Sequence, residues 1–335
     1  MNSKERLDRY LKGERVDRRP NLTIVGSVVT RYTNISIPEY CKDYRKMTES
    51  AIKAAHDLKL DFVQIASDLL REAEGYGSKV SYSVDNLPNV EKYAVDKVED
   101  IAKLKLVKPQ DVPRMYDLVE ATTLAISQEK DVYPFTLIVG PVTIASNICD
   151  AKNFMTFLVK EPEAVADLLE LTTGTVVEMV KNLSEVGSKH INIADPVASL
   201  VSPRHYSKFF LPLHQRVFEE MNSRQICSRL HMCGNTTRIL PHAVESGAVI
   251  VDIDHQVDYA QAYEMVGERV LLNGNIDPAA DVLLCDPVHT KHAVLDRAKQ
   301  INFARALFMP GCELPPQTPL ENARAIHEAL VEIGA

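Results

Sequence analysis

The chain of 335 residues carries 46 acidic and 38 basic residues, which gives a net charge of −8 with the histidines neutral. Hydrophobic residues make up 45% and charged residues 25%, a composition that excludes a disordered chain, a collagen and a coiled coil. No basic run stands out, which argues against nucleic-acid binding.

Targeting and membrane segments are not expected. The first twenty residues are densely charged and hold no apolar core of a secretory signal. No run of about 18 apolar residues occurs, so we expect no membrane span. Six scattered cysteines in so long a chain do not form the pattern of a disulfide scaffold. We therefore expect a reduced, cytoplasmic protein.

Short apolar runs alternate with helical stretches along the chain, and such runs are typical of parallel strands buried on both faces. The expected strands are residues 21–26, 61–66, 135–140, 190–195, 225–231, 249–254, 270–274 and 306–311. Apolar residues at helical spacing predict helices over residues 111–128, 162–185 and 319–331. A capping box from Thr318 to Glu321 is expected to start the last of them.

Eight strands with helices between them predict an α/β fold, a (β/α)8 TIM barrel, with residues 1–335 as one domain. The alternative is an open doubly wound sheet, whose dinucleotide-binding form is disfavoured because no G-x-G-x-x-G follows the first strand. Residues 68–108 lack a barrel element. Two β-like pieces in this stretch, residues 79–84 and 92–95, predict a small excursion over one barrel mouth.

Polar residues follow several of the expected strands. In a barrel the carboxyl ends of the strands meet at one mouth, where catalytic sites of this fold lie. The residues in question are Asp195, His231, Cys233, Asn235, Asp254, His255, Asn275, Cys312 and Glu313. We therefore expect these side chains to converge on one site.

A metal site is the sharpest interpretation of this set. His231 and Cys233 are two residues apart, so at a strand end their side chains point to the same side. Together with Cys312 they offer an imidazole and two thiolates, which suit zinc, and three protein ligands leave a fourth position open as in catalytic sites. Asp254, His255 and Glu313, which lie at or just after the ends of the expected strands 249–254 and 306–311, are alternatives for that position. The alternative without a metal is that the H-x-C pair occurs by chance and that Cys312 is simply a small residue in a tight turn.

The sequence at these residues resembles the uroporphyrinogen decarboxylase superfamily, and within it the cobamide-dependent methyltransferases, with the methylcobamide:coenzyme M methyltransferases nearest in character. The resemblance covers nearly the whole chain. H-M-C-G-N at residues 231–235 with P-G-C at 310–312 looks like the zinc motif H-x-C…C of that family. Further similar segments are residues 11–20, 140–146, 194–199, 202–203 and 319–322.

The resemblance implies a (β/α)8 barrel, zinc held by His231, Cys233 and Cys312, and a partner protein that carries a corrinoid (cobamide). It also implies transfer of a methyl group between this corrinoid and a small acceptor, a zinc-activated thiol such as coenzyme M. A homodimer is an expectation from the family alone.

The remaining polar residues receive roles as hypotheses. Candidate catalytic residues are Asp195, Asp254 and His255. Candidate substrate-binding residues are Asn235, Asn275 and Glu313. Of these, Asp254 and His255 are expected to accept the thiol proton or to act as a displaceable metal ligand.

Three alternatives stay open. The protein could take a methyl group from a small donor, an aryl methyl ether or methanol, and give it to Co(I), because the same zinc ligands would serve. Uroporphyrinogen decarboxylation is disfavoured, because residues 26–32 hold a single arginine, Arg31, where the decarboxylases carry an arginine-rich segment. A zinc-stabilised binding subunit without catalysis would instead hold zinc with four protein ligands.

Overall fold

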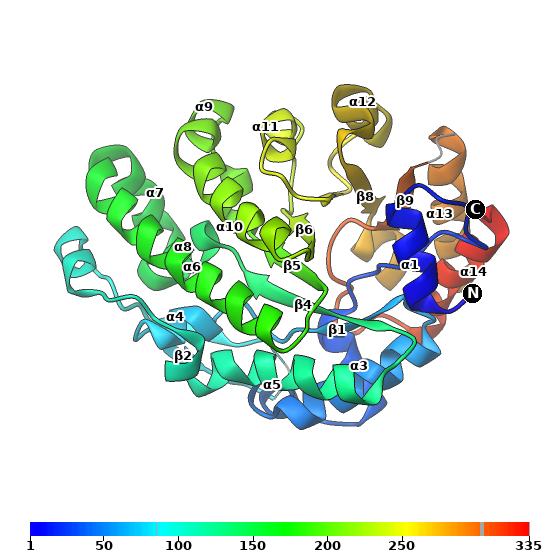
Figure 1. The fold of residues 1–335 in the computed structure, drawn as a ribbon, viewed down its shortest axis with the longest axis horizontal. Coiled ribbons are helices and arrows are strands. Elements are labelled where there is room, and N and C mark those ends of the chain that lie inside the picture. The colour runs from blue at the N-terminus through cyan, green and yellow to red at the C-terminus, as the bar shows by residue number, and fades with distance from the viewer. Residues whose placement is uncertain (85, 302–304, 335) are drawn as a thin grey trace.

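The computed structural model describes residues 1–84, 86–301 and 305–334. Within these residues, seven parallel strands form one curled sheet in the order β1-β4-β5-β6-β7-β8-β9, and helices surround it (Figure 1). The strands are β1 (Phe62–Ile65), β4 (Tyr133–Val139), β5 (His190–Ala194), β6 (Cys227–His231), β7 (Ile250–Ile253), β8 (Leu271–Ile276) and β9 (Ala306–Pro310). Seven of the predicted strands are thereby confirmed.

The first predicted strand, residues 21–26, is not part of the hydrogen-bonded sheet. The prediction of eight strands is therefore wrong at this segment. The segment still lies between the two sheet edges. On one side the backbone N–H of Asp61 donates to the carbonyl of Asn21 at 3.0 Å. On the other side the N–H of Leu314, just past β9, donates to the carbonyl of Ile24 at 3.0 Å. The segment therefore fills the gap that would otherwise leave the barrel open.

Along residues 21–26, side chains accept the backbone hydrogen bonds that a neighbouring strand would otherwise accept. The backbone N–H groups of Val25 and Gly26 both donate to the side-chain oxygen of Gln64 in β1, at 2.8 and 3.2 Å. The N–H of Asn21 donates to the carboxylate of Asp61 at 2.7 Å. Because buried backbone groups need partners, these side chains allow the chain to close the barrel without strand pairing.

Helices form the outer layer. They are α1 (Ser3–Leu11), α2 (Ile37–Lys42), α3 (Tyr44–Asp57), α4 (Arg71–Gly75), α5 (Pro113–Gln128), α6 (Pro141–Cys149), α7 (Ala151–Lys160), α8 (Pro162–Glu185), α9 (Pro203–His205), α10 (Leu211–Ser223), α11 (Leu240–Val244), α12 (Tyr259–Val266), α13 (Pro287–Gln300) and α14 (Leu320–Ile333). Helices α5, α8 and α14 confirm the three predicted helices. The predicted capping box is wrong, because the hydroxyl of Thr318 is buried without a partner. In the part of the chain that the structure describes, no helix is long and apolar enough to cross a membrane.

The excursion contains a short antiparallel hairpin of β2 (Lys79–Ser81) and β3 (Asn89–Lys92). The first strand begins where residues 79–84 predict it, and the second lies earlier than the predicted 92–95. Leu87 and Pro88, between the two strands, line a cavity at the carboxyl ends of the barrel strands together with Asp68 and Leu69. The excursion therefore forms part of the wall of one barrel mouth.

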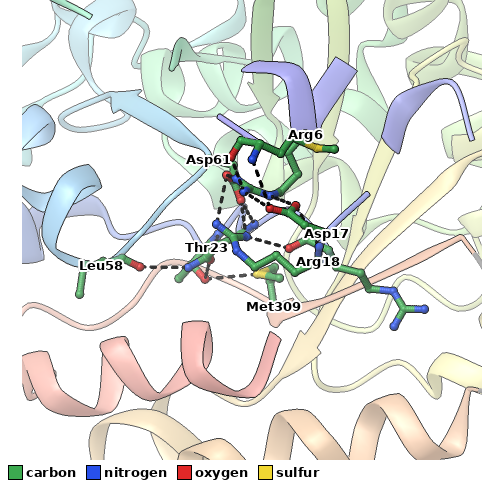
Figure 2. A network of polar contacts seen from close by, with 10 residues as sticks. Arg6, Asp17, Arg18, Thr23, Leu58, Asp61 and Met309 are labelled. Atoms are coloured by element: carbon green, nitrogen blue, oxygen red, sulfur yellow. Dashed lines mark hydrogen bonds and ion pairs between the residues drawn. The ribbon is translucent and has the colours of Figure 1, made fainter. Parts of the chain in front are cut away.

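A buried polar network ties the N-terminal segments to the beginning of β1 (Figure 2). The fully buried carboxylate of Asp61 accepts hydrogen bonds from Arg6 at 2.6 Å and from Arg18 at 2.6 Å. Asp17 holds the same Arg6 side chain at 2.7 Å. Two cations and two carboxylates thus balance each other at the amino end of the strands, away from the mouth where the predicted site lies.

Candidate metal centre

Three of the predicted residues meet at the mouth of the barrel. The ligand atoms of His231, Cys233 and Cys312 all lie within 4.8 Å of one another. The Nε2 atom of His231 is 3.1 Å from the sulfur of Cys233 and 3.7 Å from that of Cys312, and the two sulfurs are 3.0 Å apart. One nitrogen and two sulfurs at such spacing can bind one ion, and this donor set is typical of zinc.

The local chain conformation explains how the cluster forms. His231 ends β6, and Cys233 follows two residues later, before Gly234 turns the chain with φ of +84°. Cys312 follows Gly311, whose hydrogen faces the backbone of the loop after β7. A β-carbon at residue 311 would lie 2.8 Å from the backbone nitrogen of His255. Glycine there therefore permits the close approach of the end of β9 to the loop after β7.

A second layer of buried side chains orients the imidazole. The Nδ1 atom of His231 lies 2.7 Å from a carboxylate oxygen of Asp252 in β7. Asp252 also accepts hydrogen bonds from Arg229 at 2.8 Å and from Asn273 at 2.7 Å. A carboxylate at Nδ1 keeps the proton on that nitrogen and leaves Nε2 free to bind a metal.

The electrostatics of the cluster favour positive charge between its donor atoms. Burial acts to lower the pKa of His231, but its hydrogen bonds with Asp252 and Cys312 outweigh burial and raise that pKa to about 10. The hydrogen bond between the two thiols shifts their pKa values in opposite directions. It lowers the pKa of Cys312, with help from His231 and against the effect of burial, and it raises the pKa of Cys233, with help from burial. A thiolate thus forms readily at Cys312, and metal binding requires thiolates.

The cluster forms part of the wall of a cavity of about 390 Å³. Glu313 lines the same cavity, and its carboxylate accepts a hydrogen bond from the N–H of Ser27 at 3.1 Å. Burial raises the pKa of Glu313 to about 7. Most of the remaining wall is apolar and comes from the barrel strands, the segments that follow them, α6, and the excursion. A small molecule in this cavity would meet both the metal ligands and a carboxyl group able to exchange a proton near neutral pH.

Asp195, predicted to be catalytic, lies behind the wall of the cavity rather than in it. Its carboxylate is fully buried and accepts from the N–H and the hydroxyl of Thr143, both at 2.7 Å. It also accepts from the N–H of Val142 at 3.2 Å and lies 2.9 Å from Nε2 of His214. These contacts hold the first turn of α6 beside the end of β5.

Four further predicted residues do not line the cavity among its described wall residues. Asp254 accepts from the N–H of Gly234 at 3.0 Å, and His255 lies 2.9 Å from Asp254 with 37% of its side chain exposed. Asn235 is exposed and caps its own turn, while the amide of Asn275 donates to the carbonyl of Val257. Asp254 and Asn235 thus shape the loop that carries Cys233, while His255 and Asn275 make their contacts in and beside the loop after β7.

Comparison with known proteins places the chain in a family. The sequence matches the family described as uroporphyrinogen decarboxylase (URO-D) over residues 2–333. The chain belongs to the URO-D family. This membership agrees with the curled parallel sheet and confirms the predicted barrel fold.

Within the URO-D family, the chain is similar to methyltransferases. It is 28% identical over 343 residues to a methylcobamide:CoM methyltransferase (MtbA) of Methanosarcina acetivorans, which covers 97% of this chain and 96% of the relative. A methylcobamide:CoM methyltransferase (MtaA) of Methanosarcina barkeri is 31% identical over 199 residues, or 58% of this chain and 57% of the relative. A solved methyltransferase structure from Methanosarcina mazei matches with a TM-score of 0.88 and 25% identity, covering 99% of both chains.

The sequence interpretation of this URO-D family member missed Asp252 and Arg229. Both sit inside buried strands, Asp252 two positions before Asp254 and Arg229 two positions before His231. Because alternate residues of a strand share a face, the charges at 229 and 252 belong to the face that carries His231 and Asp254. A charged residue buried in a parallel strand was the available signal.

Proposed function

We propose that the chain is a zinc-dependent methyltransferase that moves a methyl group between a corrinoid carried by a partner protein and a small thiol. The observation that carries the proposal is the meeting of His231, Cys233 and Cys312 in the wall of one cavity at the barrel mouth. Relatives that cover nearly the whole chain and are named methylcobamide:CoM methyltransferases support the same reaction class. We further propose that residues 1–335 act as one domain, with the excursion part of the active cavity.

The donor set fits zinc, because one imidazole nitrogen and two thiolates leave a position for substrate. When bound, zinc would lower the pKa of a substrate thiol so that its thiolate form predominates at neutral pH. Asp252 would hold His231 in the orientation and tautomer that present Nε2, and Arg229 and Asn273 would in turn fix Asp252.

The residues of the chain divide the work of the reaction. We assign Glu313 the role of accepting the thiol proton, since it lines the cavity and Asp254 and His255 do not. The substrate sulfur then forms a bond to the methyl carbon of the methylcorrinoid. The cobalt–carbon bond breaks with both electrons staying on cobalt, which passes from Co(III) to Co(I). The cavity wall contributes positioning and excludes water around the reacting atoms.

The decarboxylase reaction of the wider family is less well supported. Arg31, the one arginine after the first predicted strand, donates to the backbone carbonyl of Thr318 at 2.6 Å. It is not among the described residues that line the cavity. A substrate with many carboxylates would therefore lack the cationic partners it needs.

The test is thiol-dependent loss of the methyl group from methylcobalamin, followed by absorbance. The wild-type protein is expected to accelerate this loss, and Cys312→Ala is expected to abolish the acceleration. The matched control is Cys285→Ala, which removes a thiol whose sulfur bonds the carbonyl of Ala280 away from the cluster. Full activity in Cys312→Ala, or equal loss of activity in both variants, would contradict the proposal.

A further inference from the structure

The charge of the cavity restricts the substrate. Among the described residues that line it there is no lysine and no arginine. The ionisable groups of the wall are the acids Asp68 and Glu313 and the three members of the metal cluster. In either protonation state, Glu313 offers no positive charge to a ligand.

The two arginines nearest to Asp68 are already paired with the protein. Arg114 makes ion pairs with the carboxylates of Asp68 and Glu74, the second at 2.7 Å. Arg71 is 1% exposed and donates to the hydroxyl of Ser67 at 2.8 Å and to the carbonyl of Cys41 at 3.3 Å. Neither guanidinium lines the cavity, so neither can meet an anionic group of a substrate there.

The metal cluster does not change this balance. Two cysteine thiolates offset the double positive charge of a zinc ion, so a substrate thiolate brings the centre to a net charge of −1. A second anion on the substrate would be desolvated in a mostly apolar cavity. Asp68 there is already paired with Arg114 and Glu313 offers no positive charge, so no cation among the described wall residues is left to pair with the anion. Such an unpaired charge is strongly unfavourable.

We infer that the substrate of this cavity is a small thiol without a second charged group, and that the apolar wall selects it against thiols that carry a sulfonate or carboxylate. The inference rests on the proposed function and sharpens it. It also departs from the acceptor expected from the family resemblance, because coenzyme M is 2-mercaptoethanesulfonate and carries a permanent negative charge.

Binding can be measured independently of turnover. The protein is loaded with Co²⁺ in place of zinc, and thiols are titrated while the thiolate-to-cobalt absorption is followed. The probes are 1-propanethiol and 2-mercaptoethanesulfonate, which differ in charge but little in length, with each affinity corrected for the pKa of the free thiol. We expect 1-propanethiol to bind about tenfold or more tightly than the sulfonate.

A matched pair of variants tests the cause. Leu87 lines the cavity from the excursion and is 36% exposed, so a polar side chain is tolerated there. Leu87→Lys supplies the missing cation, and Leu87→Gln supplies similar polarity without charge. Relative to Leu87→Gln, we expect Leu87→Lys to bind 2-mercaptoethanesulfonate about tenfold more tightly and 1-propanethiol equally.

The outcomes separate the inference from the proposed function. Equal or tighter binding of the sulfonate by the wild-type protein overturns the inference, and so does the failure of every thiol to change the cobalt spectrum. Binding in the expected order without any loss of methyl from methylcobalamin supports the inference about the cavity and overturns the proposed function alone.

Discussion

Replacing Asp252 by asparagine probes the support of the metal centre without touching a ligand. The carboxylate of Asp252 receives hydrogen bonds from His231 at 2.7 Å, Arg229 at 2.8 Å and Asn273 at 2.7 Å. An amide of the same shape keeps one acceptor oxygen and turns an N–H₂ group toward these donors. The change therefore removes both the charge and the acceptor capacity that hold the imidazole.

Two effects follow from this geometry. Loss of a carboxylate behind a metal-binding histidine typically lowers metal affinity by about 10- to 100-fold, which is about 1.4 to 2.7 kcal/mol. In addition, Arg229 is 1% exposed and would lose its counter-charge, an uncompensated buried cation that costs about 3–5 kcal/mol of folding stability. We expect Asp252→Asn to show both losses.

Zinc affinity is measured by competition with a chelator of known affinity, and stability by urea unfolding of the same preparations. The matched control is Asp195→Asn, which alters another fully buried carboxylate with four hydrogen-bonding contacts, none of them to a metal ligand. Its buried donors lose part of their acceptor, so it should lose about 1–3 kcal/mol of folding stability, while its zinc affinity stays within about threefold of wild type. Wild-type affinity in Asp252→Asn, or equal loss in the control, would refute this reasoning.

Three other substitutions have defined outcomes. Asp61→Ala leaves two buried arginines without their shared carboxylate and should lower the unfolding free energy by about 3–5 kcal/mol with zinc content unchanged, as urea unfolding and metal analysis would show. Gly311→Ala places a β-carbon 2.8 Å from the backbone nitrogen of His255 and should cost about 1–3 kcal/mol and weaken zinc binding; normal affinity would speak against the role of this close approach. Burial lowers the pKa of His190 to about 3. The contribution of this neutral histidine to the unfolding free energy is therefore fully present above pH 6.5, where the histidine of the unfolded chain is also neutral. Below that pH the contribution falls by about 1.4 kcal/mol for each pH unit until the pH reaches about 3. His190→Phe should flatten this loss between pH 7 and pH 4.5, and an unchanged slope would exclude His190 as its source.

The barrel was predictable because its strands are short apolar runs buried on both faces, and such runs are visible in the sequence. The exception is residues 21–26, which are equally apolar but do not pair as a strand. Their N–H groups bond the side chain of Gln64 and the carboxylate of Asp61 instead. The local sequence does not show whether these N–H groups will bond the backbone of a neighbouring strand or a side chain, because the side chains that accept them lie about 40 positions later in the chain.

The site was predictable in part for a similar reason. The three candidate ligands were visible because each lies at or just after the end of a strand and carries metal-binding chemistry, and the structure brings them together. The neighbouring acids could not be ranked from the sequence. Asp254 and Glu313 both come at the ends of strands. The carboxylate of Asp254 accepts a hydrogen bond from the N–H of Gly234 and does not line the cavity, whereas Glu313 does. That difference is set by the loop path and not by residue type.

The most direct test of the account is the zinc content of the purified protein after loosely bound ions are removed. We expect about one zinc per chain in the wild type and in Cys285→Ala, and none in Cys233→Ala or Cys312→Ala with the fold intact by circular dichroism. A wild-type protein without zinc that takes up none on reconstitution would contradict the central claim. Zinc retained in full by both cysteine variants would contradict it equally.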